Sequence, residues 1–160
     1  TRTNASSAVE LILTASASVD FILIDLGLIT YSEISILERR WENVFSTWVL
    51  ETADDLWLFS SPRTVSARAL REISVALPQM TIRGRITFLL TQRIAGKRGD
   101  EQEEKFLAVV SPTKPHALRI LPLDHRGVSA ASHNRSILIE SNPRGALRRS
   151  YAAIALELTQ

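Results

Sequence analysis

The chain contains no cysteine, and it lacks other features that define common classes of protein. Without cysteine it can form no disulfide, no thiolate metal site and no thiol nucleophile. No uninterrupted apolar run approaches the roughly 18 residues that would indicate a membrane-spanning helix. The sequence begins with neither methionine nor a charged-then-apolar leader, so we expect Thr1 to be a fragment boundary.

Motifs for phosphate binding and for a serine nucleophile are also missing. A P-loop needs Gly, four residues, Gly-Lys and then Ser or Thr, because its N–H groups and its lysine wrap phosphates. The one Gly-Lys pair is Gly96-Lys97, with Thr91 five places before it and Arg98 after it, so the pattern fails at both ends. No Gly-x-Ser-x-Gly elbow occurs either.

Alternating strand and helix patterns run along the whole chain. Short apolar runs predict strands at residues 20–25, 56–59, 86–90 and 118–121. Helical spacing and start signals predict helices at residues 5–17, 31–50, 62–77, 101–110, 127–133 and 142–158, with a loop over much of 94–105. Strands separated by helices imply βαβ units, so we expect one α/β domain over residues 1–160 with a parallel sheet and flanking helices.

The ends of the predicted strands carry most of the polar residues that could perform chemistry. Carboxyl ends of parallel strands share one edge of a sheet, and ligands bind beyond that edge. Asp25 ends the first strand and Gly27 follows it, an arrangement that can hold Mg²⁺ through water beside a phosphate. An aspartate in this position also serves as a turn former or helix cap. The histidines lack the spacing of a metal site; they are His116, His125 and His133.

Charge is spread unevenly. Residues 1–60 hold nine acids and three bases, a net −6, whereas residues 61–160 hold eight acids and sixteen bases, a net +8. Arginines gather on the last predicted helix at Arg144, Arg148 and Arg149. They form either a solvated face or a contact with DNA or an anionic lipid surface. We therefore expect a cytoplasmic protein that can lie at the membrane periphery.

The order of these segments resembles the C-terminal part of the ParA/MinD group of P-loop ATPases. Residues 20–27, Asp-Phe-Ile-Leu-Ile-Asp-Leu-Gly, are similar to the Walker B strand of that group. The segments 53–70, 86–93, 118–131 and 134–143 resemble the family's later strands and helices, in the family's order. The resemblance spans about residues 8–158 and leans toward the CpaE/TadZ-like branch of pilus and secretion systems. It implies a partial P-loop NTPase fold of the SIMIBI type.

The resemblance also implies roles for particular residues. Asp25 takes the Walker B role, orienting Mg²⁺ and its water, and Gly27 lies in the loop that senses the γ-phosphate. The adenine is bordered by residues from two later strand ends: Gln92, Arg93, Pro122, Leu123 and Asp124. In the intact family ATP closes a dimer, and hydrolysis releases it from a surface or partner.

Some positions depart from the family pattern. Leu26 stands where the family often has proline, which puts switch coupling in doubt, and Gln92 replaces the usual asparagine. The family's P-loop lies far upstream of Walker B, whereas only 24 residues precede Asp25. We therefore expect the P-loop segment to have been cut away or to sit on another chain, so that this chain alone completes no ATP site.

Two other functions fit the same sequence. One is a non-catalytic assembly or localisation module, which would use the sheet for dimerisation or partner docking and bind no nucleotide. The helix at 31–50, with Trp41 and Trp48 on one stripe, would then be an interface element. A receiver-like or flavodoxin-like domain is the weaker alternative, because it would need an acidic or phosphate-binding cluster near the first strand.

Overall fold

A computed structural model describes residues 5–27 and 41–158 of the chain. Its strands are β1 (Asp55–Ser60), β2 (Arg85–Arg93) and β3 (Ala117–Pro122). Its α-helices are α1 (Ala5–Ser16), α3 (Trp41–Thr52), α4 (Thr64–Ala76), α5 (Lys97–Val110), α6 (His125–Asn134), α7 (Leu138–Ser141) and α8 (Ala146–Leu158). Two short 3₁₀ helices, η1 (Leu77–Gln79) and η2 (Ser111–Thr113), follow α4 and α5. This order of elements is the α/β arrangement that the sequence predicts.

The three strands form one parallel sheet in the order β1-β2-β3. Leu58 of β1 stands beside Phe88 of β2, which stands beside Leu118 of β3. The predicted strands at 56–59, 86–90 and 118–121 each fall within an observed one, because apolar runs in a parallel sheet are buried on both faces. The parallel pairing confirms the predicted βαβ organisation for these strands.

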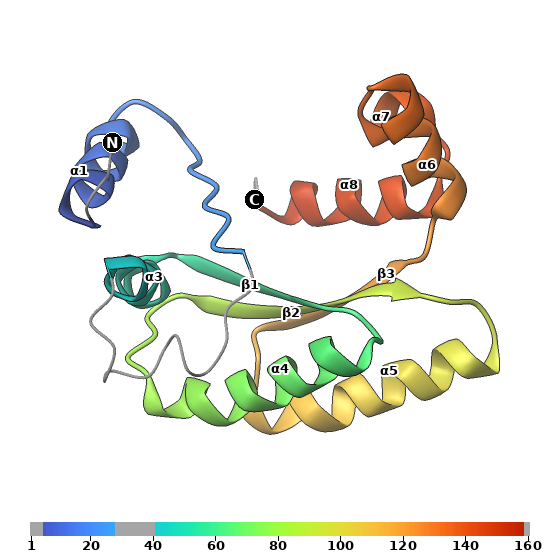
Figure 1. Ribbon diagram of the computed structural model, residues 1–160, viewed down its shortest axis with the longest axis horizontal. Coiled ribbons are helices and arrows are strands. Elements are labelled where there is room, and N and C mark those ends of the chain that lie inside the picture. The colour runs from blue at the N-terminus through green and yellow to red at the C-terminus, as the bar shows by residue number, and fades with distance from the viewer. Residues whose placement is uncertain (1–4, 28–40, 159–160) are drawn as a thin grey trace.

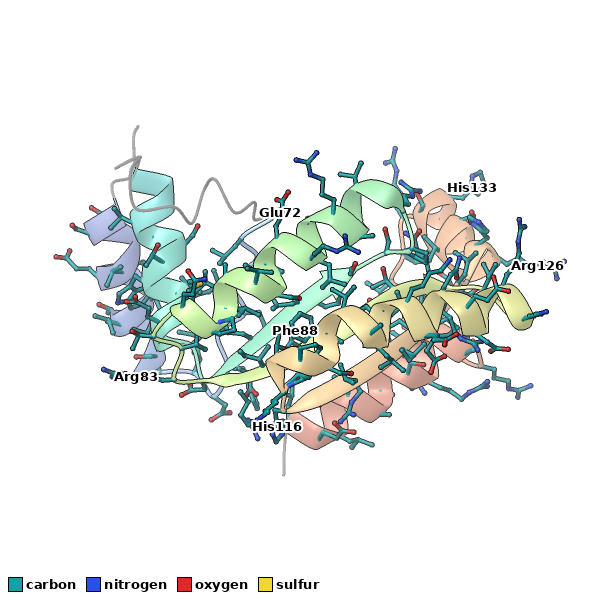
Figure 2. All side chains as sticks on the ribbon, turned by 90° about the horizontal axis from the view of Figure 1, so that it is seen from below. Glu72, Arg83, Phe88, His116, Arg126 and His133 are labelled. Carbon is teal, nitrogen blue, oxygen red and sulfur yellow. The ribbon has the colours of Figure 1, made fainter. Side chains whose placement is uncertain are left out.

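Helices cover both faces of the sheet, with α4 and α5 below it and α8 above it in Figure 1. The larger core lies between the sheet and the α4–α5 pair. It is formed by Leu70, Ile73, Leu77, Phe88, Leu90, Phe106 and Val110. Phe88 is fully buried at its centre, labelled in Figure 2. Val65 in the first turn of α4 is 73% exposed, whereas Leu70 and Ile73 farther along that helix are buried.

The opposite face of the sheet has a smaller core under α8. Leu89 and Leu121 from the strands pack there against Ile154 of α8. Trp57 of β1 lies partly buried at the margin of this cluster, and Phe59 beyond it is 54% exposed. Within the part of the chain that the structure describes, α8 thus covers β3 more fully than β1.

The predicted first strand is not a strand in the structure. Residues 19 and 21–27 have no regular secondary structure, and Leu23 is 90% exposed. A strand exists through hydrogen bonds to a neighbour. Among the described strands, β1 pairs with β2 alone, so no neighbour holds residues 20–25. The apolar composition of residues 20–25 is typical of a strand, but composition does not specify which strand would pair with it.

The helix after β2 begins earlier than the sequence predicted. We expected a loop over most of 94–105 and a helix from about Glu101, whereas α5 begins at Lys97. Gly99 is buried in the first turn of that helix, which explains why a glycine occurs there without breaking it. The last helix begins later than predicted, at Ala146, because Leu138–Ser141 forms the separate short helix α7.

The starts of β1 and β2 are joined by a side-chain pair. Arg85 donates to both carboxylate oxygens of Asp55, over 2.9 and 2.7 Å. The two residues are direct partners in the strand register. The hydrogen bond to Asp55, followed by the charge of Asp55, raises the pKa of Arg85.

The N-terminal helices pack on one another beside the sheet. Helix α1 contacts α3, and α3 leads into β1 with Val49 and Leu50 buried. Phe45 stacks on Trp48 with ring centroids 6.2 Å apart, as the aromatic stripe of that helix predicted. The rest of the predicted helix, before Trp41, lies outside the described residues. In the described part of the chain no helix is long and apolar enough to cross a membrane.

Candidate functional site at the carboxyl ends of the strands

The three strands end at the same edge of the sheet. Ser60 at the end of β1 stands beside Leu90, and Arg93 at the end of β2 stands beside Pro122. The Thr91 hydroxyl donates to the Ser60 carbonyl over 3.0 Å, which joins β1 and β2 at this edge. We call this edge, residues 60–66, 91–94 and 122–124, the rim. Three of the four predicted strand ends therefore lie together.

Gln92 lies at an irregularity in the end of β2. The register with β3 shifts between Leu90 and Arg93, and Gln92 has φ 59°. The left-handed region costs a residue with a Cβ roughly 1–2 kcal/mol. The Leu123 N–H closes the far side of the irregularity by donating to the Arg93 carbonyl over 2.9 Å. Gln92 is exposed on the rim as a result.

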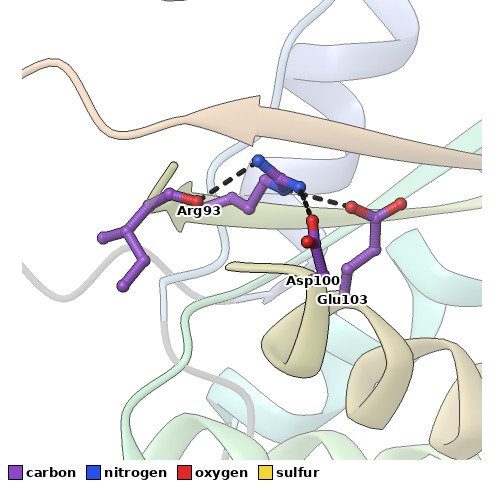
Figure 3. A network of polar contacts seen from close by, with 4 residues as sticks. Arg93, Asp100 and Glu103 are labelled. Atoms are coloured by element: carbon purple, nitrogen blue, oxygen red, sulfur yellow. Dashed lines mark hydrogen bonds and ion pairs between the residues drawn. The ribbon is translucent and has the colours of Figure 1, made fainter. Parts of the chain in front are cut away.

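Arg93 is held by the helix that follows it rather than left free, as Figure 3 shows. Its Nη2 donates to Asp100 over 2.5 Å and its Nε to Glu103 over 3.1 Å. Its Nη1 donates to the Ile94 carbonyl over 3.2 Å. The arginine side chain is 25% exposed, so these contacts are partly shielded from solvent. The guanidinium therefore clamps the start of α5 to the end of β2.

Gly99 permits this close approach. A Cβ at Gly99 would stand 1.9 Å from the Ile94 carbonyl oxygen and 3.3 Å from the Arg93 guanidinium carbon. No side chain fits at the first distance without moving the backbone. The start of α5 is thus defined by Gly99 together with the two carboxylates that pair with Arg93.

Asp124 has its carboxylate in two hydrogen bonds within the protein. One oxygen accepts from the Gly127 N–H over 2.8 Å, which caps the N-terminus of α6. The other accepts from the Asn142 side-chain amide over 2.9 Å. A Cβ at Gly127 or Gly145 would stand 2.6 or 2.4 Å from the Asp124–Asn142 pair. This node fixes the end of β3 to the starts of α6 and α8.

Asp25 and Gly27 lie outside the sheet. The Asp25 carboxylate accepts from the Gly27 N–H over 2.8 Å, and Gly27 has φ 69°. Asp25 is exposed, and its hydrogen bond to the Gly27 N–H closes a local turn outside the sheet. In the described residues no group of three His, Asp or Glu side chains could hold a metal ion, and the histidines form no such cluster.

Several residues in the rim, or in contact with it, were not named as site residues from the sequence. The Ser61 and Ser66 hydroxyls lie 2.9 Å apart at the start of α4. Asp100, Glu103 and Asn142 contact two of the predicted site residues. Polar residues are common in loops and helix starts, so composition gave no reason to select the two serines or the two acids. Asn142-Pro143 was noticed only as a helix start.

A shallow depression of about 520 Å³ lies along α5. Its lining consists of Asp100, Glu103, Glu104, Leu107, Ala108 and Ser111. Two of its three carboxylates pair with Arg93, Glu104 adds a further negative charge, and no lysine or arginine lines the depression, so it offers nothing that would attract a polyphosphate. This depression is therefore no candidate for a nucleotide phosphate site.

Comparison with known proteins gives one informative result. No protein-family model and no curated protein sequence matches the chain. Among solved structures, a ParA family ATPase from Chlorobium tepidum TLS is similar, with a TM-score of 0.74 and 18% sequence identity. The likeness covers 96% of this chain but only 57% of that protein, so the chain spans little more than half its length. The chain therefore shares the α/β fold of that protein over the matched part, with a parallel sheet between flanking helices (Figure 1).

Proposed function

We propose that this chain is the C-terminal part of a ParA/MinD-like ATPase. ATP-dependent dimerisation of the intact protein would position a partner complex in cell division, partition, or pilus or secretion assembly. The observation that carries the proposal is the fold: nearly all of this chain matches little more than half of a ParA family ATPase. Residues 1–160 would then be one portion of a larger nucleotide-binding domain, whose P-loop lies upstream or on another chain.

At the phosphate end of the proposed site, Asp25 would hold Mg²⁺ through water. An exposed carboxylate suits this role, because Mg²⁺ keeps several waters and is held through few protein ligands. The bond from the Gly27 N–H couples the turn to the same carboxylate. A γ-phosphate that displaced this bond would change the turn, which is how Gly27 would sense the nucleotide.

At the base end, the proposed border consists of Gln92, Arg93, Pro122, Leu123 and Asp124. Gln92 and Leu123 are exposed and Pro122 is partly exposed, so these residues together offer an amide and an apolar surface to an adenine. Arg93 and Asp124 are engaged inside the protein. Their contribution would be to hold the ends of β2 and β3 in place behind the base.

The test joins the chain to the segment encoded upstream of Thr1 and measures ATP hydrolysis with Mg²⁺. Asp25→Ala should lower the rate by about 10–100-fold, the usual loss when a group that orients a metal through its outer shell is removed. Asp20→Ala is the matched control, because Asp20 is an exposed aspartate in the same segment. Equal rates for the two variants would contradict the assigned role of Asp25.

A second function has support of its own: an assembly or localisation module that binds no nucleotide. Arg93 and Asp124 are satisfied by partners within the chain, and the depression on α5 is acidic. Under this alternative the rim is structural and the sheet serves dimerisation or partner docking. Reading the coding sequence upstream of Thr1 separates the two, because a Gly-Lys-Ser/Thr loop after a strand supports the ATPase.

A further inference from the structure

Helix α8 is attached to the sheet by fewer buried side chains than the helices on the other face. The core beneath α4 and α5 contains seven buried side chains, of which four come from those two helices. The core beneath α8 contains three, and only Ile154 belongs to α8 itself. The free energy of apolar burial follows the area removed from water. Separating α8 from the sheet therefore costs much less than separating α4 and α5.

The neighbours of α8 are also few. Helices α4 and α5 pack against one another as well as against the strands. Within the described residues α8 packs chiefly on β3, on the opposite side of the sheet from that pair, as Figure 1 shows. Tyr151 is 42% exposed and Leu156 64%, so much of the helix faces away from the protein. Helix α8 can thus leave the sheet without separating any other pair of helices.

Polar contacts hold α8 at its two ends. Before its first residue, Asn142 donates to Asp124, and this contact does not involve the helix. Near its last residue, Glu157 pairs with Arg119 of β3. The side chains of Glu157 and Arg119 are 54% and 34% exposed, so water and salt weaken their attraction. The firm contact therefore lies outside α8, at a hinge near Gly145, and the contact at the far end is weak.

We propose that α8 opens from the sheet as a unit while α4, α5 and the three strands stay folded. Local opening of this kind involves the least stable contacts of a fold. Opening would uncover Leu89 and Leu121 beside the half-buried Trp57. Phe59, whose ring lies 6.5 Å from that of Trp57, is already 54% exposed, so opening would enlarge an existing apolar surface. Helix α8 would thus control access to this face of the sheet. The inference goes beyond the proposed ATPase function and needs no nucleotide.

The first experiment uses the absence of native cysteine. Ile154→Cys on α8 and Ile73→Cys on α4 are matched, because both isoleucines lie in 13-residue helices and are 6% and 7% exposed. The rate at which each thiol reacts with a labelling reagent is divided by the rate of the same variant unfolded in urea. The normalised rate of Ile154→Cys should be at least about tenfold higher, since local opening costs less than global unfolding. It should also depend less on urea, because less surface is exposed.

The second experiment tests the ion pair at the far end of α8. In the Ile154→Cys background, Glu157→Gln should raise the labelling rate by about two- to fivefold, the loss of a partly exposed pair. Glu72→Gln is the control, because it removes the exposed Arg68–Glu72 pair on α4 and should leave the rate unchanged. High salt should raise the rate of Ile154→Cys itself and should have less effect after Glu157→Gln.

Circular dichroism verifies that each variant folds. If Ile154→Cys does not, hydrogen exchange of the unsubstituted chain decides by mass spectrometry, with amides of α8 expected to exchange before those of α4 and α5. The proposal is overturned if the two thiols react at equal normalised rates, or if their rates share one urea dependence. It is also overturned if Glu157→Gln leaves the Ile154→Cys rate unchanged, or if α8 and α4 exchange together.

Discussion

Asp124 is the residue at which structural and nucleotide roles can be separated most directly. Asp124→Ala removes the cap of α6, which costs about 1 kcal/mol. It also leaves the half-buried Asn142 amide without its acceptor, which costs about 1–1.5 kcal/mol more. The free energy of unfolding should therefore fall by about 2–2.5 kcal/mol, measured by urea denaturation of the chain.

Two further variants resolve that loss into its parts. Asp124→Asn keeps a good capping residue, so it should cost less than about 1 kcal/mol. Asn142→Ala removes the second hydrogen bond and leaves the cap in place. In a double-mutant cycle the two alanine substitutions should be coupled by about 0.5–1.5 kcal/mol, because they share one hydrogen bond. An Asp124→Ala variant within about 0.5 kcal/mol of the parent, or an additive cycle, would refute the reasoning.

Two more predictions concern the start of α5. Gly99→Ala should destabilise the chain by about 3 kcal/mol, since its Cβ would meet the Ile94 carbonyl, whereas the exposed Glu101→Ala should change the urea-derived stability by less than about 0.5 kcal/mol. A Gly99→Ala variant as stable as Glu101→Ala would show that the backbone there yields easily. Arg93→Gln should cost about 1–2 kcal/mol at low ionic strength and less in high salt, because it removes two partly shielded ion pairs. The control is Arg98→Gln, because Arg98 is an exposed arginine in the first turn of α5, and an equal loss there would contradict a specific role for Arg93.

Much of the fold could be predicted because it depends on local patterns. Apolar runs located β1, β2 and β3 within a few residues, and the parallel order followed from the helices between them. Burial at the centre of β2 is what an apolar run of its length requires, with Phe88 and Leu89 fully buried. The edge of the sheet at which the three strands end followed from the same parallel order.

The remaining features depend on contacts between distant residues. A strand at 20–25 required a neighbour that the sequence pattern does not specify. Helix α5 begins at Lys97 because Arg93 pairs with carboxylates seven and ten residues later and because Gly99 fits against a carbonyl. Asp124 was predicted to border a base. Its hydrogen bonds to Gly127 and Asn142 could not be predicted from residue spacing. The roles of the predicted site residues toward ATP and Mg²⁺ stay predictions.

The central claim is that this chain supplies one part of a nucleotide-binding domain. Isothermal titration calorimetry of the chain joined to its upstream segment, with Mg²⁺-ATP as the titrant, tests that claim most directly. The account predicts saturable binding by the joined protein and weaker binding by its Asp25→Ala variant. A folded joined protein that gives no heat of binding with Mg²⁺-ATP would contradict it.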